Sequence, residues 1–338
     1  MSEKTKQFLS EIFLILGSII GMGFASGKEV SRFFCYNKTL AFSGVFLFAI
    51  LFIIFFNLVF NFKKKYNILD LNSFNEKIFK NNSKNIKIIL IIIYSISSSC
   101  MLAGLDLLIN SIFSLNFSTF SLFFSFILFF IIIGGIKRIK IIFSKILPVL
   151  LILIFINLFV NSFNFTERFS NFLPFNFDNI TFKNLSLSIL FPTLFFGSNL
   201  IIAINSILAS KRKGVGYLSS IIFVVFLLLG SIVVFNTNFS SMPFLDASKN
   251  LSTVFYYFYL IAILIALFSS VSISTFNIYS LMNTKTKFSA ILIILINQIL
   301  AFLGFDFIVN YLYTFTGLLG LTYIIFISVK MIMLLRKN

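Results

Sequence analysis

An apolar run near the amino terminus is interrupted by the stretch Gly17-Ser-Ile-Ile-Gly-Met-Gly-Phe-Ala-Ser-Gly-Lys-Glu29. The interruption is rich in glycine and polar residues, whereas the residues before it are apolar. Bilayer hydrocarbon offers no hydrogen-bond partner to an unwound backbone, which persists at that depth only where it is buried in protein or lines a cavity. We therefore expect residues 17–29 to interrupt a membrane helix. They are also the best candidate for the functional site of the protein.

The composition is that of a membrane protein. Of 338 residues, 59% are hydrophobic and 51 are phenylalanine, with no histidine or tryptophan. Soluble domains contain roughly 45–50% apolar residues, and here the excess comes in blocks of about 20 residues, the length that crosses a bilayer. We expect an all-α polytopic protein that forms a single integral membrane domain over residues 1–338.

Ten apolar segments are expected to cross the membrane, at about residues 8–34, 40–62, 86–113, 119–136, 141–160, 184–210, 214–235, 251–281, 288–307 and 309–334. Lysine and arginine cluster in alternate gaps, as at 63–65, 137–140 and 211–213, and the positive-inside rule then places both termini in the cytoplasm. The bias toward Ile, Phe, Asn and Lys is typical of an AT-rich bacterial genome, which favours the bacterial cytoplasmic membrane. The net charge of +17 is spread over six loops, unlike the contiguous basic face of a nucleic-acid-binding protein.

The segments divide into two halves. The longest predicted external loop, 161–183, separates repeats of about 8–160 and 184–334 with five spans each, so the second must enter the membrane from the opposite side. The sixth span contains Phe191-Pro-Thr-Leu-Phe-Phe-Gly-Ser-Asn199, a second Pro/Gly interruption at the matching position. Paired interruptions predict inverted repeats with helices 1 and 6 broken at mid-membrane around a transporter site. The alternative is that the glycines serve close packing and the proline a kink.

The polar residues after each break suggest restarted helices. Ser26 and Glu29 have the spacing of a capping box, and Ser198 or Asn199 could cap the sixth span. The amino ends of half-helices suit a carboxylate and the carboxyl ends suit a cation, a combination that fits a zwitterion. The candidate substrate-binding residues are Gly21, Met22, Gly23, Phe24, Ser26, Thr193, Phe195, Phe196, Gly197 and Asn199.

With these features the layout resembles the amino acid–polyamine–organocation transporter superfamily, the LeuT-like fold. Within it, Gly17–Val30 followed by Phe33-Phe34 is similar to the YkvI-type bacterial putative amino acid permeases, with weaker support from Ser98–Gly104. The resemblance implies a candidate Na⁺ site, with the substrate carboxylate at the backbone of Met22 and Gly23. Its ligands would be Gly17, Ile20, Ala266, Ser269 and Ser270, although serine in a membrane helix also bonds its own backbone. In other members a lysine of span five replaces the ion, and Lys145 lies in that span close to the basic loop, where it could instead snorkel to the interface.

Charged residues near the outer ends of the spans are candidate gates: Lys28, Glu29, Arg32, Asp106 and Asp306. Such charges face a water-filled cavity or pair with each other, and ordinary interfacial pairing is the alternative. Glu11, at the cytoplasmic entrance, has the same two interpretations.

The expected function is secondary active transport of a small amino-acid-like or zwitterionic solute by alternating access, coupled to Na⁺ or H⁺. Spans one, two, six and seven would rock against three, four, eight and nine. The alternative is a ligand-sensing receptor subunit on the same fold, of the spore-germination type, which binds without transport. The sequence lacks histidine, a Gly-x-Ser-x-Gly motif and a P-loop, so we expect no enzyme. The expected partners are the lipid bilayer and the solute; no cofactor is expected apart from Na⁺, and the oligomeric state is not indicated.

Overall fold

The computed structural model describes residues 3–37, 40–113, 119–163, 181–237, 242–282 and 286–336, and within these ranges all regular elements are helical. The longer helices are α1 (Glu3–Ile19), α4 (Ala41–Tyr66), α6 (Ser83–Phe113), α7 (Thr119–Ile133), α8 (Gly135–Phe163), α10 (Phe182–Leu208), α11 (Gly214–Asn236), α13 (Thr253–Leu281), α14 (Lys287–Ala301) and α16 (Tyr313–Arg336). The shorter ones are α2 (Met22–Ala25), α3 (Lys28–Phe33), α5 (Leu71–Phe79), η1 (Lys80–Asn82), α12 (Pro243–Leu251), α15 (Phe305–Phe307) and η3 (Ile308–Leu312), the last a π-helical turn. Residues 164–180 of the predicted external loop lie outside the described residues.

Seven of the described helices are long and apolar enough to cross a membrane, namely α4, α6, α8, α10, α11, α13 and α16. An eighth span is formed if the pair Lys287–Ala301 and Phe305–Leu312, bent by 92°, is taken as one. The predicted count of ten is therefore not confirmed. Predicted span 119–136 is only the short apolar helix Phe120–Ile133, and the first predicted span is divided among α1, α2 and α3.

The bilayer-facing surface is visible in the exposure pattern of α4. Phe48, Phe52 and Phe55 are at most 2% exposed, whereas Ile50 and Ile54 on the opposite side are more than half exposed. A helix that is apolar on all sides yet exposes one of them is stable only where the surrounding medium is itself apolar. This pattern agrees with the membrane protein that the composition predicts.

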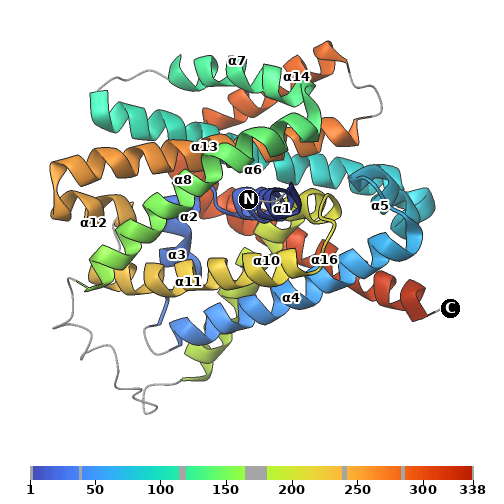
Figure 1. Cartoon of the computed structure of the whole chain (residues 1–338), viewed down its shortest axis with the longest axis horizontal. Coiled ribbons are helices and arrows are strands. Elements are labelled where there is room, and N and C mark those ends of the chain that lie inside the picture. The colour runs from blue at the N-terminus through green and yellow to red at the C-terminus, as the bar shows by residue number, and fades with distance from the viewer. Residues whose placement is uncertain are drawn as a thin grey trace.

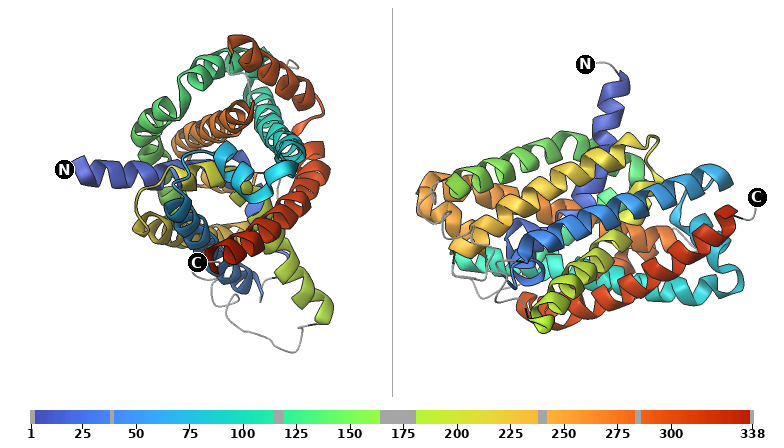
Figure 2. Two further views of the ribbon diagram at one scale, coloured as in Figure 1. Left: turned by 90° about the vertical axis from the view of Figure 1, so that its right-hand side faces the viewer. Right: turned by 90° about the horizontal axis from the view of Figure 1, so that it is seen from below.

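The first broken segment lies between two groups of helices. Figure 1 shows α6, α7, α13 and α14 on one side of α1 and α4, α10, α11 and α16 on the other. Helix α1 packs on α8, α10, α11 and α13, and α2 packs on α6 and α13. The amino-terminal end of α1 projects from the side of the bundle, crosswise to the other long helices (Figure 2).

The break predicted in the sixth span is absent, because α10 runs without interruption from Phe182 to Leu208. Its proline packs against a glycine of α4, since a Cβ on Gly44 would lie 2.6 Å from Pro192 Cγ. A Cβ on Gly197 would collide with the carbonyl oxygen of Gly317, and one on Gly320 with the carbonyl oxygen of Gly197. The helix-breaking residues of α10 thus serve close helix–helix packing, as small residues do in membranes. The prediction that helix 6 is broken was wrong.

Candidate functional site

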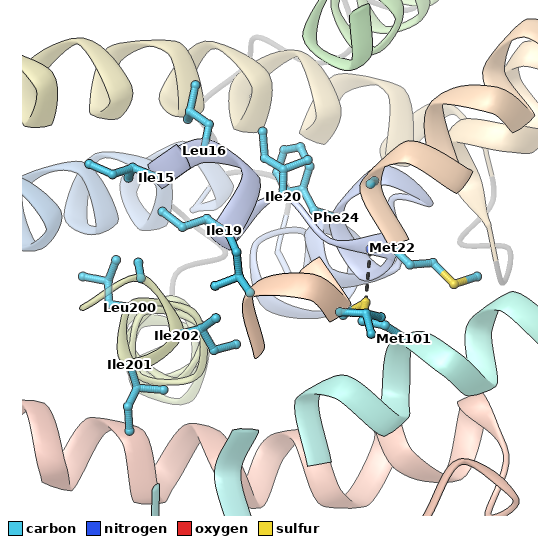
Figure 3. Packing of buried hydrophobic residues seen from close by; sticks show 14 of the residues in the cluster. Ile15, Leu16, Ile19, Ile20, Met22, Phe24, Met101, Leu200, Ile201 and Ile202 are labelled. Carbon is cyan, nitrogen blue, oxygen red and sulfur yellow. Dashed lines mark hydrogen bonds between the residues drawn. The ribbon is translucent and has the colours of Figure 1, made fainter. Parts of the chain in front are cut away.

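The helical hydrogen-bond ladder stops between α1 and α2. The Gly21 amide donates to the Ile19 carbonyl (3.1 Å) and the Met22 amide to Met101 Sδ of α6 (3.3 Å), as Figure 3 shows for the second contact. In a continuous helix these two amides would bond the carbonyl oxygens of Gly17 and Ser18. The break predicted within residues 17–29 is therefore present, and two buried carbonyl groups lose their usual donors there.

Helix α3 restarts differently from the prediction. Its N-cap is Gly27, at φ 84°, which has no side chain of its own to form a cap. Ser26 Oγ donates to the Gly23 carbonyl (3.2 Å) and accepts from the Lys28 amide (3.4 Å), and the Ser26 amide donates to the Met22 carbonyl. The predicted capping box with Ser26 as N-cap is therefore wrong: α3 begins one residue later, after Gly27 in the left-handed conformation that glycine readily adopts.

The Glu29 side chain lies at the break and not in an outer vestibule. It is 2% exposed, and a Cβ on Gly23 would collide with its carboxylate. Glu29 was predicted as a gate residue, and the structure places it against the predicted substrate-binding backbone. Because residue 23 is glycine, a carboxylate can lie directly on the α2 backbone.

An aromatic wall continues from the break toward α10. The Phe24 ring lies 4.9 Å from that of Phe223 of α11, which in turn lies 6.2 Å from Phe195. Phe195 also packs 5.5 Å from Phe48, and Phe196 packs 6.1 Å from the same ring. The predicted phenylalanines therefore meet as a buried cluster, which α4 and α11 complete.

The remaining α10 candidates make contacts within or between helices. The Thr193 hydroxyl donates to the Leu190 carbonyl (2.8 Å), and Asn199 Nδ2 donates to the Phe195 carbonyl (3.2 Å). Gly197 lies on α16. Neither Ser198 nor Asn199 caps a helix, because both lie inside α10.

The candidate Na⁺ ligands come together only in part. A Cβ on Gly21 would lie 2.8 Å from Ser270 Oγ, so this hydroxyl adjoins the break. Ser269 Oγ instead donates to the Ala266 carbonyl of its own helix (2.9 Å), the alternative noted for membrane serines. Ile20 is fully buried. A Cβ on Gly17 would meet Leu147 of α8.

Lys145 does not approach this place. Its side chain is exposed and lines a groove of about 900 Å³ between α1 and α8, together with Lys6 and Lys140. This position matches the snorkelling interpretation of Lys145.

Arg32 of α3 holds one end of the broken segment, the end predicted from the sequence to face outside. Its guanidinium donates to the carbonyl oxygens of Val309 (3.0 Å) and Asn310 (2.7 Å), to Asn310 Oδ1 (2.7 Å) and to Thr314 Oγ1 (2.8 Å). Lys28 adds an ion pair with Asp306 at 3.8 Å, in which the Asp306 side chain is 60% exposed. These contacts link the broken segment to η3 and the start of α16.

Asp106 and Glu11 have different positions. Asp106 Oδ1 accepts from the Ser121 amide in the first turn of α7 (3.1 Å), so it joins α6 to α7 and takes no part in the Arg32 contacts. Glu11 is 1% exposed and accepts from Lys140 Nζ (3.5 Å) and from the Lys211 amide (2.9 Å). Glu11 therefore joins α1 to α8 and to the connection between α10 and α11.

Polar contacts also join α10 to α6 and α13. Asn277 Nδ2 donates to the Ile202 carbonyl and Asn205 Nδ2 donates to Asn277 Oδ1, both at 2.9 Å. The Tyr94 hydroxyl donates to the Ile201 carbonyl at 2.9 Å. All three polar side chains are buried.

Two residues outside the sequence prediction, one from α12 and one from α13, cover the end of the broken segment at Ala25–Gly27. The Phe244 amide of α12 donates to the Ser26 carbonyl (3.1 Å), and the Tyr259 hydroxyl of α13 donates to the Ala25 carbonyl (2.7 Å). The Phe244 ring fills the space in front of Gly27. Met101 was the one missed residue with a usable signal, since it lies in the Ser98–Gly104 segment.

No protein-family model matches the chain, and no curated protein matches it by sequence. Among solved structures, 23 chains match. One is a Na⁺-coupled sialic acid symporter in a substrate-bound, outward-open state, with a TM-score of 0.65 and 14% identity over 95% of this chain and 78% of that chain. The chain has a LeuT-like fold. The LeuT-like fold predicted from the sequence is thus confirmed. The YkvI-type resemblance stays a prediction.

Proposed function

We propose that the chain is a secondary transporter for a small solute that carries both a carboxylate and an amine. The observation that carries the proposal is the buried break between α1 and α2 in a LeuT-like fold. Unwound backbone at this depth provides donors and acceptors that a continuous helix would have used internally.

The Met22 amide is the proposed contact of the substrate carboxylate. Its present acceptor is the Met101 thioether at 3.3 Å, and sulfur of this kind is a weak acceptor. A carboxylate in its place would form a charge-assisted hydrogen bond, roughly twice as strong as a neutral one. Met101 is flexible and can withdraw when the solute arrives.

The Glu29 carboxylate is the proposed contact of the substrate amine. It lies against Gly23, the next residue after Met22, so both poles of a zwitterion would be recognised within one short segment. A cationic amine compensates the burial of this carboxylate, which is 2% exposed. Phe24 and Phe223 make the adjoining wall apolar, which suits an apolar side chain on the solute.

The further features of the proposal follow from the sequence. Na⁺ is the proposed coupling ion, with H⁺ as the alternative, and both termini lie in the cytoplasm of a bacterium. The repeats 8–160 and 184–334 are inverted copies, and the chain is an amino acid permease of the YkvI type.

Uptake into proteoliposomes tests the proposal. We expect the purified protein to accumulate at least one labelled amino acid under an inward Na⁺ or H⁺ gradient, and analogues without the carboxylate or the amine not to compete. Glu29→Gln should lower uptake by about 30-fold or more, because it removes one partner of a buried charge pair. Glu76→Gln is the matched control, since Glu76 pairs with Lys87 on the surface. Full uptake by Glu29→Gln would refute the assigned amine contact, and binding without uptake would favour the sensor.

The coupling ion is tested separately with two serines of α13. Ser270 Oγ adjoins Gly21, whereas Ser272 Oγ donates to the Phe268 carbonyl of its own helix (2.6 Å). If Na⁺ binds at the break, Ser270→Ala should raise the Na⁺ concentration for half-maximal uptake by about tenfold, the loss of one ligand hydrogen-bond equivalent. Ser272→Ala should leave it unchanged. Uptake that ignores Na⁺ but follows a pH gradient would assign H⁺.

A further inference from the structure

A basic hollow lies where α5, η1 and the carboxyl end of α16 meet. It has a volume of about 290 Å³ and includes Lys77, Lys80 and Lys330 in its lining. Figure 1 shows α5 and the end of α16 at the same end of the bundle. All three lysines are exposed, and none makes an ion pair with a carboxylate of the described residues.

The nearby carboxylates are engaged elsewhere. Glu76 pairs with Lys87 at 3.2 Å, and Asp70 accepts from the Ser73 amide at the start of α5. Lys65 Nζ donates to the carbonyl oxygens of Leu334 and Leu335. These two carbonyl groups carry the partial negative charge of the end of α16, so their capping leaves the hollow positively charged.

Aromatic rings position two of the lysines. The Lys77 ammonium lies 4.4 Å from the centroid of the Tyr66 ring, and that of Lys330 lies 5.7 Å from the centroid of Phe326. Cation–π contacts of this kind hold an ammonium group in place without neutralising it. The hollow therefore presents fixed positive charge.

An apolar hollow of about 340 Å³ adjoins the basic one, and Phe79 lines both. It lies between α6 and α16 and is lined by Ile86, Ile89 and Phe326 among others. The Phe79 ring stacks on Phe326, with centroids 5.2 Å apart and planes at 8°. A positively charged end followed by an apolar channel along two membrane helices matches one ligand class, a lipid with an anionic head group.

We propose that the groove between α6 and α16 binds an anionic phospholipid, with the phosphate at Lys77, Lys80 and Lys330 and an acyl chain along Phe79, Ile86 and Phe326. This site is separate from the break between α1 and α2 and does not depend on the proposed transport. The Tyr323 hydroxyl, behind the apolar hollow, donates to Asn75 Oδ1 of α5 at 2.6 Å. The bound lipid therefore lies against the contacts that hold α5 to α16.

Native mass spectrometry of the purified full chain tests the proposal, with phosphatidylglycerol and phosphatidylcholine offered in equal amounts. We expect phosphatidylglycerol to be retained about tenfold or more over phosphatidylcholine. The combined substitution Lys77→Gln, Lys80→Gln and Lys330→Gln should bring the two lipids close to parity. The matched control carries Lys211→Gln, Lys213→Gln and Lys287→Gln, three exposed lysines outside the groove, and should keep the preference.

A second variant keeps the charge and fills the apolar hollow. Thr322 lines this hollow, so Thr322→Trp should lower retention of phosphatidylglycerol severalfold while gel filtration shows the same folded protein. The proposal is overturned if the control variant loses the preference as much as the groove variant, or if the groove variant keeps it. It is equally overturned if wild-type protein retains both lipids alike, or if glycerol phosphate alone displaces the lipid at the lipid's own concentration.

Discussion

Removal of the Arg32 guanidinium should open the outer end of the protein. In Arg32→Ala, α3 loses all four hydrogen bonds to Val309, Asn310 and Thr314. Lys28→Ala is the comparison, because it removes one ion pair of 3.8 Å whose acidic partner is 60% exposed. Both variants delete one positive charge from the same short helix, so their difference isolates the hydrogen bonds.

The magnitudes follow from the exposure of these contacts. Hydrogen bonds to charged groups contribute up to about 1.5–3 kcal/mol when buried, but the Arg32 site is partly exposed, and about 0.5 kcal/mol for each of four bonds is a cautious value. The sum of about 2 kcal/mol corresponds to an approximately 30-fold shift from closed to open. For Lys28→Ala, about 0.5 kcal/mol or less corresponds to roughly a twofold shift.

Spin labels attached at Tyr36→Cys and Tyr311→Cys can report the opening through the distance between them, measured by double electron–electron resonance. Both tyrosines are exposed, at 48% and 67%. Tyr36 follows α3 and Tyr311 belongs to η3, the two elements that the Arg32 contacts join. The native cysteines Cys35 and Cys100 are buried and would be replaced by alanine. In Arg32→Ala, the narrow distribution of short distances between the two labels should be replaced mainly by longer distances. The reasoning fails if the distances stay unchanged, or if Lys28→Ala opens the protein more than Arg32→Ala does.

Two further predictions concern α10. Gly197→Val should lower the stability in detergent by about 1–3 kcal/mol through overpacking against the α16 backbone, measured as a fall in Tm. The control is Gly214→Ala, whose Cβ would meet only Phe8 at 3.6 Å and which should leave Tm unchanged. Equal shifts of Tm in the two variants would contradict the packing argument. Asn277→Leu should weaken the contact of α13 with α10 by leaving Asn205 without its 2.9 Å acceptor, so deuterium uptake of the α10 amides near Asn205 should rise; unchanged uptake would count against this contact.

The first break was predictable because four glycines and several polar residues fall together within one short stretch, Gly17–Glu29, of an otherwise apolar segment, and α1 does end at Ile19. The prediction of the second break was wrong because proline and glycine in a membrane helix serve either to break the helix or to pack closely against a neighbour. Only the tertiary structure shows that Pro192 fits Gly44 and Gly197 fits α16.

The candidate site was predicted for the residues of α1 and α2 but not for their partners. Phe244 and Tyr259 come from α12 and α13, and no local pattern indicates which residues of these two helices meet the break. Only Met101 of α6 lies in a segment, Ser98–Gly104, that the sequence had singled out. The sequence analysis grouped Glu29 with the charged residues at the outer ends of the spans, because its position was judged as if the first span were one straight helix. The turn at Gly27 instead brings its carboxylate back to Gly23.

The backbone contact between α10 and α16 has a mechanical consequence. Backbone atoms of α10 and α16 are in direct contact at Gly197, Gly317 and Gly320, with no side chain between the two helices. Helices packed this closely resist sliding past each other, and such interfaces shift as units. The pair is therefore expected to move as one rigid unit. If α10 rocks with the spans named from the sequence, α16 should travel with it although it lies outside those four spans. Bending within the first span is then expected at Gly21 and Gly27, where α1, α2 and α3 are separated.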